Sequence, residues 1–349
     1  MIGLDIVEAL LGAPPGYPPW RVADLAQRAE ILPTWLSSVV ARGLPLTPEA
    51  LEYLERAQRR VDALHAIGEE LSAVHPVKVV KGKKIADLMP PGLLRNSGDA
   101  DIVTRDEETL WRCVADLRQN HGAVPQGVNV LRTSDTLDVA VALKWAAEEP
   151  FLDKPLGADI GTCAYCGDLA GVEIRAEAVA DDDLGSVFAV AEERFQRKFS
   201  RKDMLDFVVL ADRLDHRLGE YLVDTLLDLA HYLSLAPELR ALIHKTGQRW
   251  ELPAVWLDIE DALEPLATEE RAARKSGKRD VPELLYGYPL DTDAAPEPQI
   301  RIHRFSGGEI ATTPIGTCLL LRDPVMTEET HQMGIEIAKQ LRSRTPREW

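Results

Sequence analysis

Apolar residues in the first 75 positions recur every three or four residues, which is the spacing of amphipathic helices. Prolines between positions 14 and 19 interrupt this pattern, so a first helix ends there and helical spacing resumes over about 21–32. Thr47 and Pro48 are an N-cap and a first-turn residue for a long helix, and Pro76 ends it. The sequence therefore predicts a helical N-terminal segment.

The pattern then changes to short apolar runs separated by turn residues. Strands are expected over 77–80, 100–104, 124–132 and 136–143. A turn at 81–84 leads into a short helix over 85–89, and Asp106 and Gly122 cap a helix predicted over about 107–120. This order of elements indicates an α+β core with a small mixed sheet.

The second half of the chain returns to a helical pattern. Residues 145–170 are predicted to be irregular, with a further short strand over 172–176. Helices are expected over 184–198, 201–215, 219–233 and 236–246. Residues 268–280 carry mostly charged side chains and are interpreted as a solvated linker. The last elements expected are strands over 300–305 and 310–321 around a Ser306-Gly307-Gly308 turn, and a helix over 328–342.

These elements divide the chain into five predicted parts. They are a helical N-terminal segment (1–75), an α+β core (76–180), a helical region (181–265), a charged linker (266–280) and a β-rich C-terminal module with a terminal helix (281–349). A length of 349 residues fits two domains or three small ones.

Composition and charge exclude several classes of protein. Hydrophobic residues make up 45% of the chain and charged residues 28%, which excludes global disorder. The 40 Lys and Arg residues against 57 Asp and Glu residues leave a formal charge of −17, so long nucleic acid is a disfavoured partner. No apolar run is long enough to span a bilayer, the first residues lack a signal-peptide pattern, and four cysteines do not make a disulfide framework. We expect a cytoplasmic protein with no membrane partner.

The segment 79–103 carries the most informative chemistry. Asp99 and Asp101 stand two apart at the start of a predicted strand, and alternate strand residues share a face at a spacing of roughly 6.6–7 Å. Their carboxylates can therefore converge on one cation, and two acids together with substrate phosphate oxygens suit Mg²⁺. Upstream, a strand runs into the Lys81-Gly82-Lys83 turn and a short helix, which presents backbone N–H groups and positive charge to a phosphate. These parts predict phosphoryl or nucleotidyl transfer.

A third carboxylate is expected on a neighbouring strand. Asp138 lies within an apolar run, where an unpaired charge is costly and a metal would be a suitable partner. We predict that Asp138 is the third metal ligand and activates an acceptor hydroxyl, with Asp135 as the alternative if the strand register differs. For Arg95 and Ser97 two interpretations stay open. They bind nucleotide phosphates, or Arg95 is a loop residue in a surface ion pair and Ser97 caps a turn.

Residues from about 77 to 214 resemble the uncharacterised nucleotidyltransferase family of the DNA polymerase β-like superfamily. The matching features are a strand ending in Lys81-Gly82, a short helix, the loop prolines Pro90-Pro91, Arg95, the Gly98-Asp99-Ala100-Asp101 strand, Asp138 followed by the aromatic Trp145, and Lys202-Asp203-Met204-Leu205-Asp206. The chain departs from the superfamily where Gly-Ser commonly follows the first strand, and where a His often stands two residues after the third acid. The resemblance implies a polymerase-β-like core and metal-dependent transfer of a nucleoside monophosphate from an NTP, with release of pyrophosphate.

The prediction is therefore a Mg²⁺-dependent nucleotidyltransferase that uses an NTP, with ATP as the default. The acceptor is a hydroxyl or similar nucleophile on a small molecule, a peptide or a protein, and the C-terminal module is expected to recognise it or a partner. One alternative is a non-catalytic binding module with the same fold, such as an antitoxin or a biosynthetic accessory protein. The other alternative is a phosphotransferase that uses the same site.

Two further motifs receive a structural interpretation. Cys163 and Cys166 form half of a zinc-binding pattern without a second half, so they are interpreted as structural or free thiols rather than a redox pair or metal site. The basic run 271–279 is interpreted as a mobile solvated loop, with a docking site for an acidic peptide or a nucleic-acid phosphate as the alternative.

Overall fold

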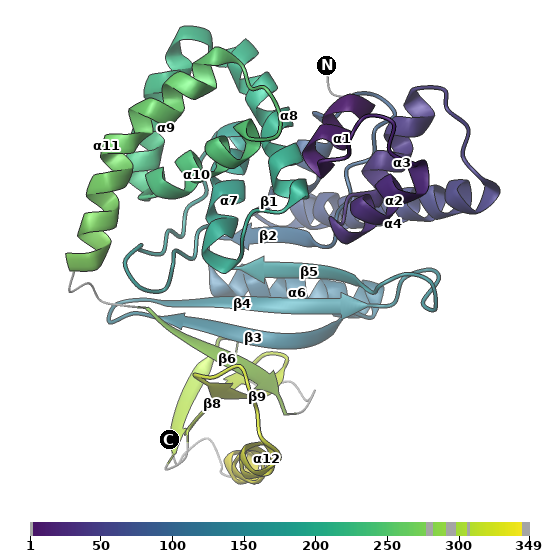
Figure 1. Cartoon of the computed structure of the whole chain (residues 1–349). Helices are drawn as coiled ribbons and strands as arrows, with labels where there is room; N and C mark the ends of the chain where they lie inside the picture. The colour runs from purple at the N-terminus through teal and green to yellow at the C-terminus, as the bar shows by residue number, and fades with distance from the viewer. Residues whose placement is uncertain (1–2, 277–281, 291–297, 306–307, 344–349) are drawn as a thin grey trace. The chain divides into compact units, whose positions relative to one another are not determined.

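The computed structural model describes residues 3–276, 282–290, 298–305 and 308–343 (Figure 1). Helices and one nine-stranded sheet place the chain in the α+β class, as predicted. The strands are β1 (Val77–Val80), β2 (Ala100–Thr104), β3 (Val124–Arg132), β4 (Leu137–Trp145), β5 (Leu156–Gly161), β6 (Glu283–Pro289), β7 (Arg301–Phe305), β8 (Gly308–Thr313) and β9 (Gly316–Leu321). Their order across the sheet is β1-β2-β5-β4-β3-β6-β9-β8-β7.

The helices fall between these strands and at both ends of the described chain. They are α1 (Leu4–Leu11), α2 (Pro19–Arg28), α3 (Leu32–Ala41), α4 (Pro48–Val74), α5 (Gly82–Ala86), α6 (Glu107–His121), α7 (Asp182–Gln196), α8 (Arg201–Leu218), the 3₁₀ turn η1 (Gly219–Tyr221), α9 (Leu222–Leu233), α10 (Ala236–Gly247), α11 (Ala254–Ser276) and α12 (Glu328–Ser343). Among the described residues, no helix combines the length and the apolar character needed to cross a membrane.

The chain forms two compact units. Unit 1 comprises Met1–Glu70, Val79–Asp101 and Tyr165–Arg279, and unit 2 comprises Leu71–Lys78, Ile102–Ala164 and Asp280–Trp349. The domain limits inferred from the sequence stay predictions.

The N-terminal part of unit 1 is a helical cluster, which agrees with the predicted helical segment. Residues of α1, α2 and α3 pack into one core that includes Val7, Ile31 and Trp35. Two of the helices begin at a proline, α2 at Pro19 and α4 at Pro48, where the missing N–H would have no helical partner in any case.

Four later helices of unit 1, α7, α8, α9 and α11, pack around α10. The buried rings of Phe207 on α8 and Trp256 on α11 meet edge to face, with centroids 5.0 Å apart. Side-chain caps determine where two of these helices begin. Asp181 accepts hydrogen bonds from the first turn of α7, and Ser200 forms a reciprocal capping box with Asp203 at the start of α8.

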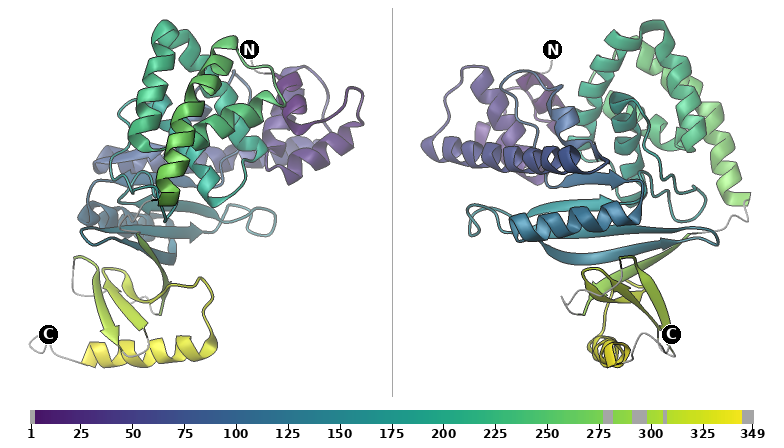
Figure 2. Two further views of the ribbon diagram at one scale, coloured as in Figure 1. Left: turned by 60° about the vertical axis from the view of Figure 1, so that its left-hand side comes forward. Right: turned by 180° about the vertical axis from the view of Figure 1, so that it is seen from behind.

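Unit 2 contains an antiparallel group of strands covered by one helix. In this group β4 pairs with β3 on one side and with β5 on the other, and α6 runs along one face of these strands (Figure 2). Every second residue of β4 is buried, as the alternating sequence predicts. The α6 caps are also confirmed, because Asp106 accepts from the Thr109 N–H at 2.7 Å and Gly122 ends the helix with a φ of 65°.

The C-terminal strands continue this group through antiparallel pairs of β6 with β3 and β9, and of β8 with β9 and β7. A Cβ atom at Gly287 on β6 would lie 2.0 Å from the backbone oxygen of Val128 on β3, so this close approach requires glycine. Arg132 on β3 donates hydrogen bonds to Glu283 on β6 and Glu309 on β8.

Three predictions about secondary structure are wrong. The 145–170 stretch is not irregular throughout, because it contains β5, whose glycines and acid weaken the local strand signal. Residues 172–176 form no strand and contribute only an isolated bridge between Tyr165 and Arg175. Residues 268–276, which were interpreted as a solvated charged run or linker, are helical, because α11 continues to Ser276.

Some predictions concern residues whose structure is not described. Ser306 and Gly307 of the predicted turn, and residues 277–280 of the predicted linker, lie outside the described residues. None of the four cysteines, all of which are described, is in a disulfide.

Candidate functional site

Two aspartates stand at the start of β2 in unit 1. Asp99 precedes the strand, Asp101 is its second residue, and each offers a carboxylate oxygen within 4.8 Å of the other. Ala100 and Ile102 are buried, whereas Asp101 is half-buried and Asp99 is exposed. Strand alternation therefore directs the apolar residues to the core and both acids to the opposite face. The structure thus brings together the two acids that the D-x-D spacing singled out.

The ammonium group of Lys81 lies close to the same acids. Lys81 connects β1 to α5 with a φ of 57°, a conformation that non-glycine residues rarely adopt and that often marks functional sites. Its Nζ donates to Glu193 Oε1 of α7 at 2.5 Å, and 17% of the side chain is exposed. Burial alone would lower the pKa of Lys81, but the carboxylates of Asp101, Glu193 and Glu192 outweigh it and raise the pKa. Lys81 is therefore a permanent positive charge beside Asp101.

Gly82 and Lys83 complete the predicted phosphate-binding turn. Gly82 has a φ of 40°, which favours glycine, and a Cβ atom there would meet only Val79 Cγ1 at 3.8 Å. Lys83 Nζ lies 2.7 Å from Asp87 Oδ1 and 3.8 Å from Glu69 Oε1, so this lysine pairs with acids of α5 and α4. Lys81 and Lys83 therefore have different carboxylate partners, although they are two residues apart.

Arg95 is held inside the protein by four hydrogen bonds. Its Nε and Nη2 donate to the two carboxylate oxygens of Asp206 at 2.8 and 2.7 Å, and Nη1 donates to Ser97 Oγ at 3.0 Å and to the Gly82 oxygen at 3.4 Å. Only 4% of the Arg95 side chain is exposed. This ion pair is buried, so it differs from a surface pair, and it joins the 81–83 turn to α8. The binding of nucleotide phosphates by Arg95 and Ser97 stays a prediction.

The start of α8 is organised by Asp203. This carboxylate accepts from the Ser200 N–H at 2.7 Å and from Arg197 Nη1 at 2.5 Å. It is buried, and these donors outweigh burial to lower its pKa. Asp203 is therefore a helix-capping residue.

Lys202 differs from its neighbours because its ammonium group forms no hydrogen bond or ion pair within the described part of the chain. The side chain is half-buried. Burial and the charge of Arg95 lower the pKa of Lys202, while Asp206, Asp99 and Asp101 oppose that shift. Lys202 is thus a cation near the aspartate pair that an incoming anion can reach without breaking an ion pair.

Electrostatics within unit 1 favour a cation between the two aspartates. Partial loss of hydration and the charge of Asp101 raise the pKa of Asp99, although the side chain is exposed and Lys202 and Lys81 oppose the shift. A divalent cation would remove the repulsion between the two carboxylates. Hard carboxylate oxygens, with room for substrate oxygens, are the ligands that Mg²⁺ prefers. The aspartate pair therefore fits that ion chemically.

The remaining candidate acids lie in unit 2. Asp138 on β4 is half-buried and accepts a hydrogen bond from Thr162 Oγ1 at 2.9 Å. Asp159 on β5 pairs with Ala142 of β4, so Asp159 shares a face with Asp138 but lies roughly 13 Å from it along the strand. Asp135 is exposed in the turn between β3 and β4. A single ion therefore does not bind both Asp138 and Asp159 in this arrangement.

Asp99 and Asp101 could together bind a divalent metal. No expectation from the sequence singled out Glu192 or Glu193, because the residues around them have only the pattern of an ordinary helical surface. The nine residues 194–202 contain five Lys or Arg side chains and no acid, and this basic run is visible in the sequence.

Comparisons with known proteins identify no family. No model of a protein family matches the chain. No curated protein matches it either. A proposed nucleotidyltransferase from H. pylori has a similar structure, with 16% identity and a TM-score of 0.30 over 63% of this chain and 96% of that one. JHP933 from Helicobacter pylori matches with 16% identity and a TM-score of 0.28 over 66% of this chain and 94% of that one. At these scores the similarities carry no argument about function.

Proposed function

We propose that the protein is a metal-dependent nucleotidyltransferase. The observation that supports the proposal is the Asp99–Asp101 pair on one face of β2, with the cations of Lys81 and Lys202 near it. Transfer of a nucleotidyl group needs these two components, carboxylates that hold a metal and positive charges that face a triphosphate.

The reaction would move a nucleoside monophosphate from an NTP to a hydroxyl or similar nucleophile. The nucleophile forms a bond to the α-phosphorus, the bond from that phosphorus to the bridging oxygen breaks, and pyrophosphate leaves. Bound Mg²⁺ would neutralise charge on the phosphates. Asp99 and Asp101 would hold it, Lys202 would bind phosphate oxygens, and Lys81 would stabilise the developing charge. Asp138 stays a prediction for the third carboxylate and for the base that takes the nucleophile's proton.

Calorimetric titration of each of the common NTPs, with and without Mg²⁺, tests this proposal. Wild type should bind at least one NTP in a Mg²⁺-dependent manner, and the Asp99→Asn/Asp101→Asn variant should lose that binding. The matched control is Asp258→Asn/Asp261→Asn, which removes the same charge from exposed positions of α11 in the same unit.

The outcomes separate the proposal from its main rival. Absence of Mg²⁺-dependent binding in wild type would contradict the proposal and favour a non-catalytic binding module. Equal loss in the control variant would show that overall charge, and not the aspartate pair, governs binding.

A further inference from the structure

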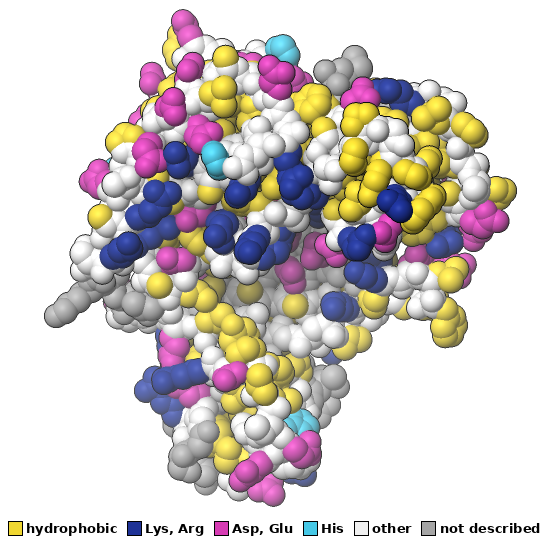
Figure 3. Space-filling model, viewed as in Figure 1, with side chains coloured by type: hydrophobic (Ala, Val, Ile, Leu, Met, Phe, Trp, Pro, Cys, Tyr) yellow, Lys and Arg dark blue, Asp and Glu magenta, His cyan; other side chains and the backbone are white. Residues whose placement is uncertain are grey.

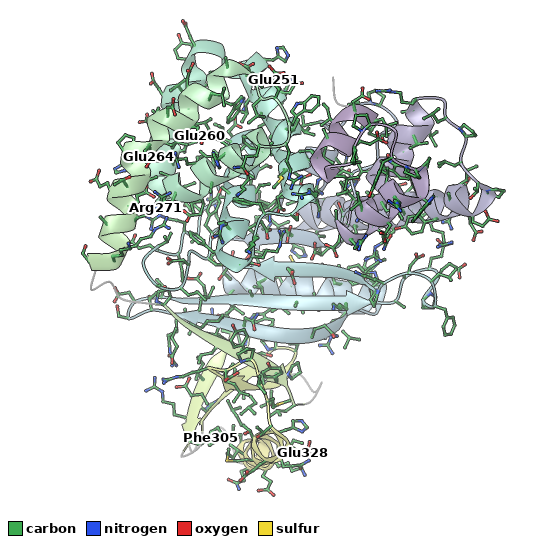
Figure 4. All side chains as sticks on the ribbon, in the orientation of Figure 1. Glu251, Glu260, Glu264, Arg271, Phe305 and Glu328 are labelled. Atoms are coloured by element: carbon green, nitrogen blue, oxygen red, sulfur yellow. The ribbon has the colours of Figure 1, made fainter. Side chains whose placement is uncertain are left out.

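A basic pocket of unit 1 is not used by the proposed mechanism. Its volume is about 370 Å³, and its lining includes Asp168, Arg194, Phe195, Glu238, Arg271 and Arg274. Arg194 and Phe195 come from the last turn of α7, and Arg271 and Arg274 from the end of α11. Figure 3 shows Lys and Arg side chains gathered near this end of α11, and Figure 4 places Arg271 beyond Glu260 and Glu264 on that helix.

The two carboxylates of the pocket are already satisfied. Glu238 accepts from Arg274 Nη1 and Nη2 at 2.9 and 2.7 Å, and the same guanidinium lies 5.4 Å from the centre of the Phe195 ring. Asp168 Oδ1 accepts three backbone N–H groups, from residues 170, 171 and 172. These hydrogen bonds, together with the charge of Arg274, outweigh burial and lower the pKa of Asp168.

The two outer arginines have no such partner. Arg194 and Arg271 are exposed, and neither forms an ion pair with a described carboxylate, although the chain carries a formal charge of −17. The planar guanidinium group binds phosphate through paired N–H donors. Two unpaired guanidinium groups around a pocket of this size therefore favour a phosphate group as occupant.

The pocket and the site proposed above both involve residues near the end of α7. Glu193 contacts Lys81, and the next residue, Arg194, lines the pocket. Consecutive Cα atoms are about 3.8 Å apart. Glu192 also accepts from the Gly167 N–H at 2.9 Å, one residue before Asp168. Consecutive residues of α7 therefore contribute to the contact with Lys81 and to the pocket, both within unit 1.

We propose that this pocket binds a phosphate group of the acceptor substrate through Arg194 and Arg271. The role of the ligand as acceptor rests on the proposed function, whereas the binding of phosphate does not. A phosphomonoester on a small molecule and a phosphodiester of an oligonucleotide present the same chemistry to these arginines, so the test includes both.

Calorimetric titrations without added Mg²⁺ test the pocket. The probes are inorganic phosphate, ribose 5-phosphate and a single-stranded tetraribonucleotide. Wild type should bind at least one of the two organic probes, and Arg194→Ala/Arg271→Ala should weaken that binding at least tenfold. The lysine pair Arg194→Lys/Arg271→Lys should retain part of it. The matched control Arg105→Ala/Lys144→Ala removes two exposed cations that do not line the pocket.

Each result has a definite meaning. Absence of binding to wild type, unchanged affinity in the alanine pair, or an equal loss in the control would overturn the proposal. Tighter binding of the tetraribonucleotide supports it with a nucleic-acid ligand, and tighter binding of ribose 5-phosphate supports it with a small one. Binding of an NTP with Mg²⁺ should be unchanged in the alanine pair. If wild type binds the probes but no NTP, the pocket stands and the proposed function fails.

Discussion

Arg95 and Asp206 are 111 residues apart in sequence, yet they form a buried bidentate ion pair with N–O distances of 2.8 and 2.7 Å. The pair joins the segment before the acid-bearing strand β2 to α8, the helix that also carries Lys202. Because α8 carries Lys202 and the segment leads to Asp99, the ion pair supports the geometry on which the proposed function depends.

We expect Asp206→Asn to destabilise unit 1 by about 3–5 kcal/mol, because it leaves the buried guanidinium of Arg95 without its counter-charge. Urea unfolding monitored by circular dichroism gives the free energy of unfolding. The control is Asp24→Asn, which breaks an exposed ion pair with Arg28 and should cost no more than about 1 kcal/mol. Similar losses in the two variants would mean that the Arg95–Asp206 pair contributes no more than a surface pair.

The Asp99→Asn variant should lose Mg²⁺-dependent NTP binding without losing stability. Partial loss of hydration and the charge of Asp101 raise the pKa of Asp99, so its ionised form is disfavoured in the folded protein and a neutral amide relieves that cost. Thermal unfolding without nucleotide should show a melting temperature equal to or above that of wild type. A large fall in melting temperature would instead make Asp99 a structural residue, and the loss of binding would then say nothing about a metal.

Local signals predicted much of the fold. Asp106 and Gly122 bound α6 as expected, and strand alternation located β3 and β4 correctly. Strand β5 was missed because the strand propensity of its residues is weak and its pairing with β4 leaves no local sequence signal. Gly157, Asp159 and Gly161 disfavour a strand, and the segment becomes one through antiparallel pairing with β4.

In the candidate site, too, local sequence patterns predict only the residues that are close together in the chain. The Asp99–Asp101 pair depends on a spacing of two residues, so the sequence was sufficient to predict it. The contact of Lys81 with Glu193 crosses 112 residues, and no local pattern indicates it. Asp138 was chosen because an acid in an apolar run needs a partner, and the structure provides Thr162 as one such partner.

Stability should fall as the pH rises through neutrality, and Glu192 should account for part of the fall. Burial raises the pKa of Glu192 from 4.5 to about 7, although the Gly167 N–H and Lys81 oppose the shift. The folded state therefore binds this proton more tightly than the unfolded state does. The resulting stability is complete below about pH 4.5 and is lost as the pH rises through about 7, at no more than about 1.4 kcal/mol per pH unit.

Urea unfolding of wild type and Glu192→Gln at about pH 5 and about pH 8 measures this contribution. The variant should show a smaller difference between the two conditions. Burial also raises the pKa of Glu270 to about 7, so Glu192→Gln/Glu270→Gln should show a still smaller difference. An unchanged difference in both variants would mean that neither carboxyl group titrates in this range.

Variants at Gly82 test whether the backbone conformation of the 81–83 turn contributes to stability and to NTP binding. Gly82→Ala should lower the free energy of unfolding by about 1–2 kcal/mol, because the φ of 40° disfavours a side chain although Val79 leaves room for a Cβ atom. Gly82→Val should cost more, since β-branching restricts the backbone further, and both variants should weaken Mg²⁺-dependent NTP binding by displacing Lys81. The control is Gly98→Ala. Gly98 also stands beside a candidate site residue, Asp99, and a Cβ atom at this position would meet nothing within 4 Å. If the Gly82 variants lose stability but bind NTP like Gly98→Ala, the turn supports the fold and takes no part in nucleotide binding.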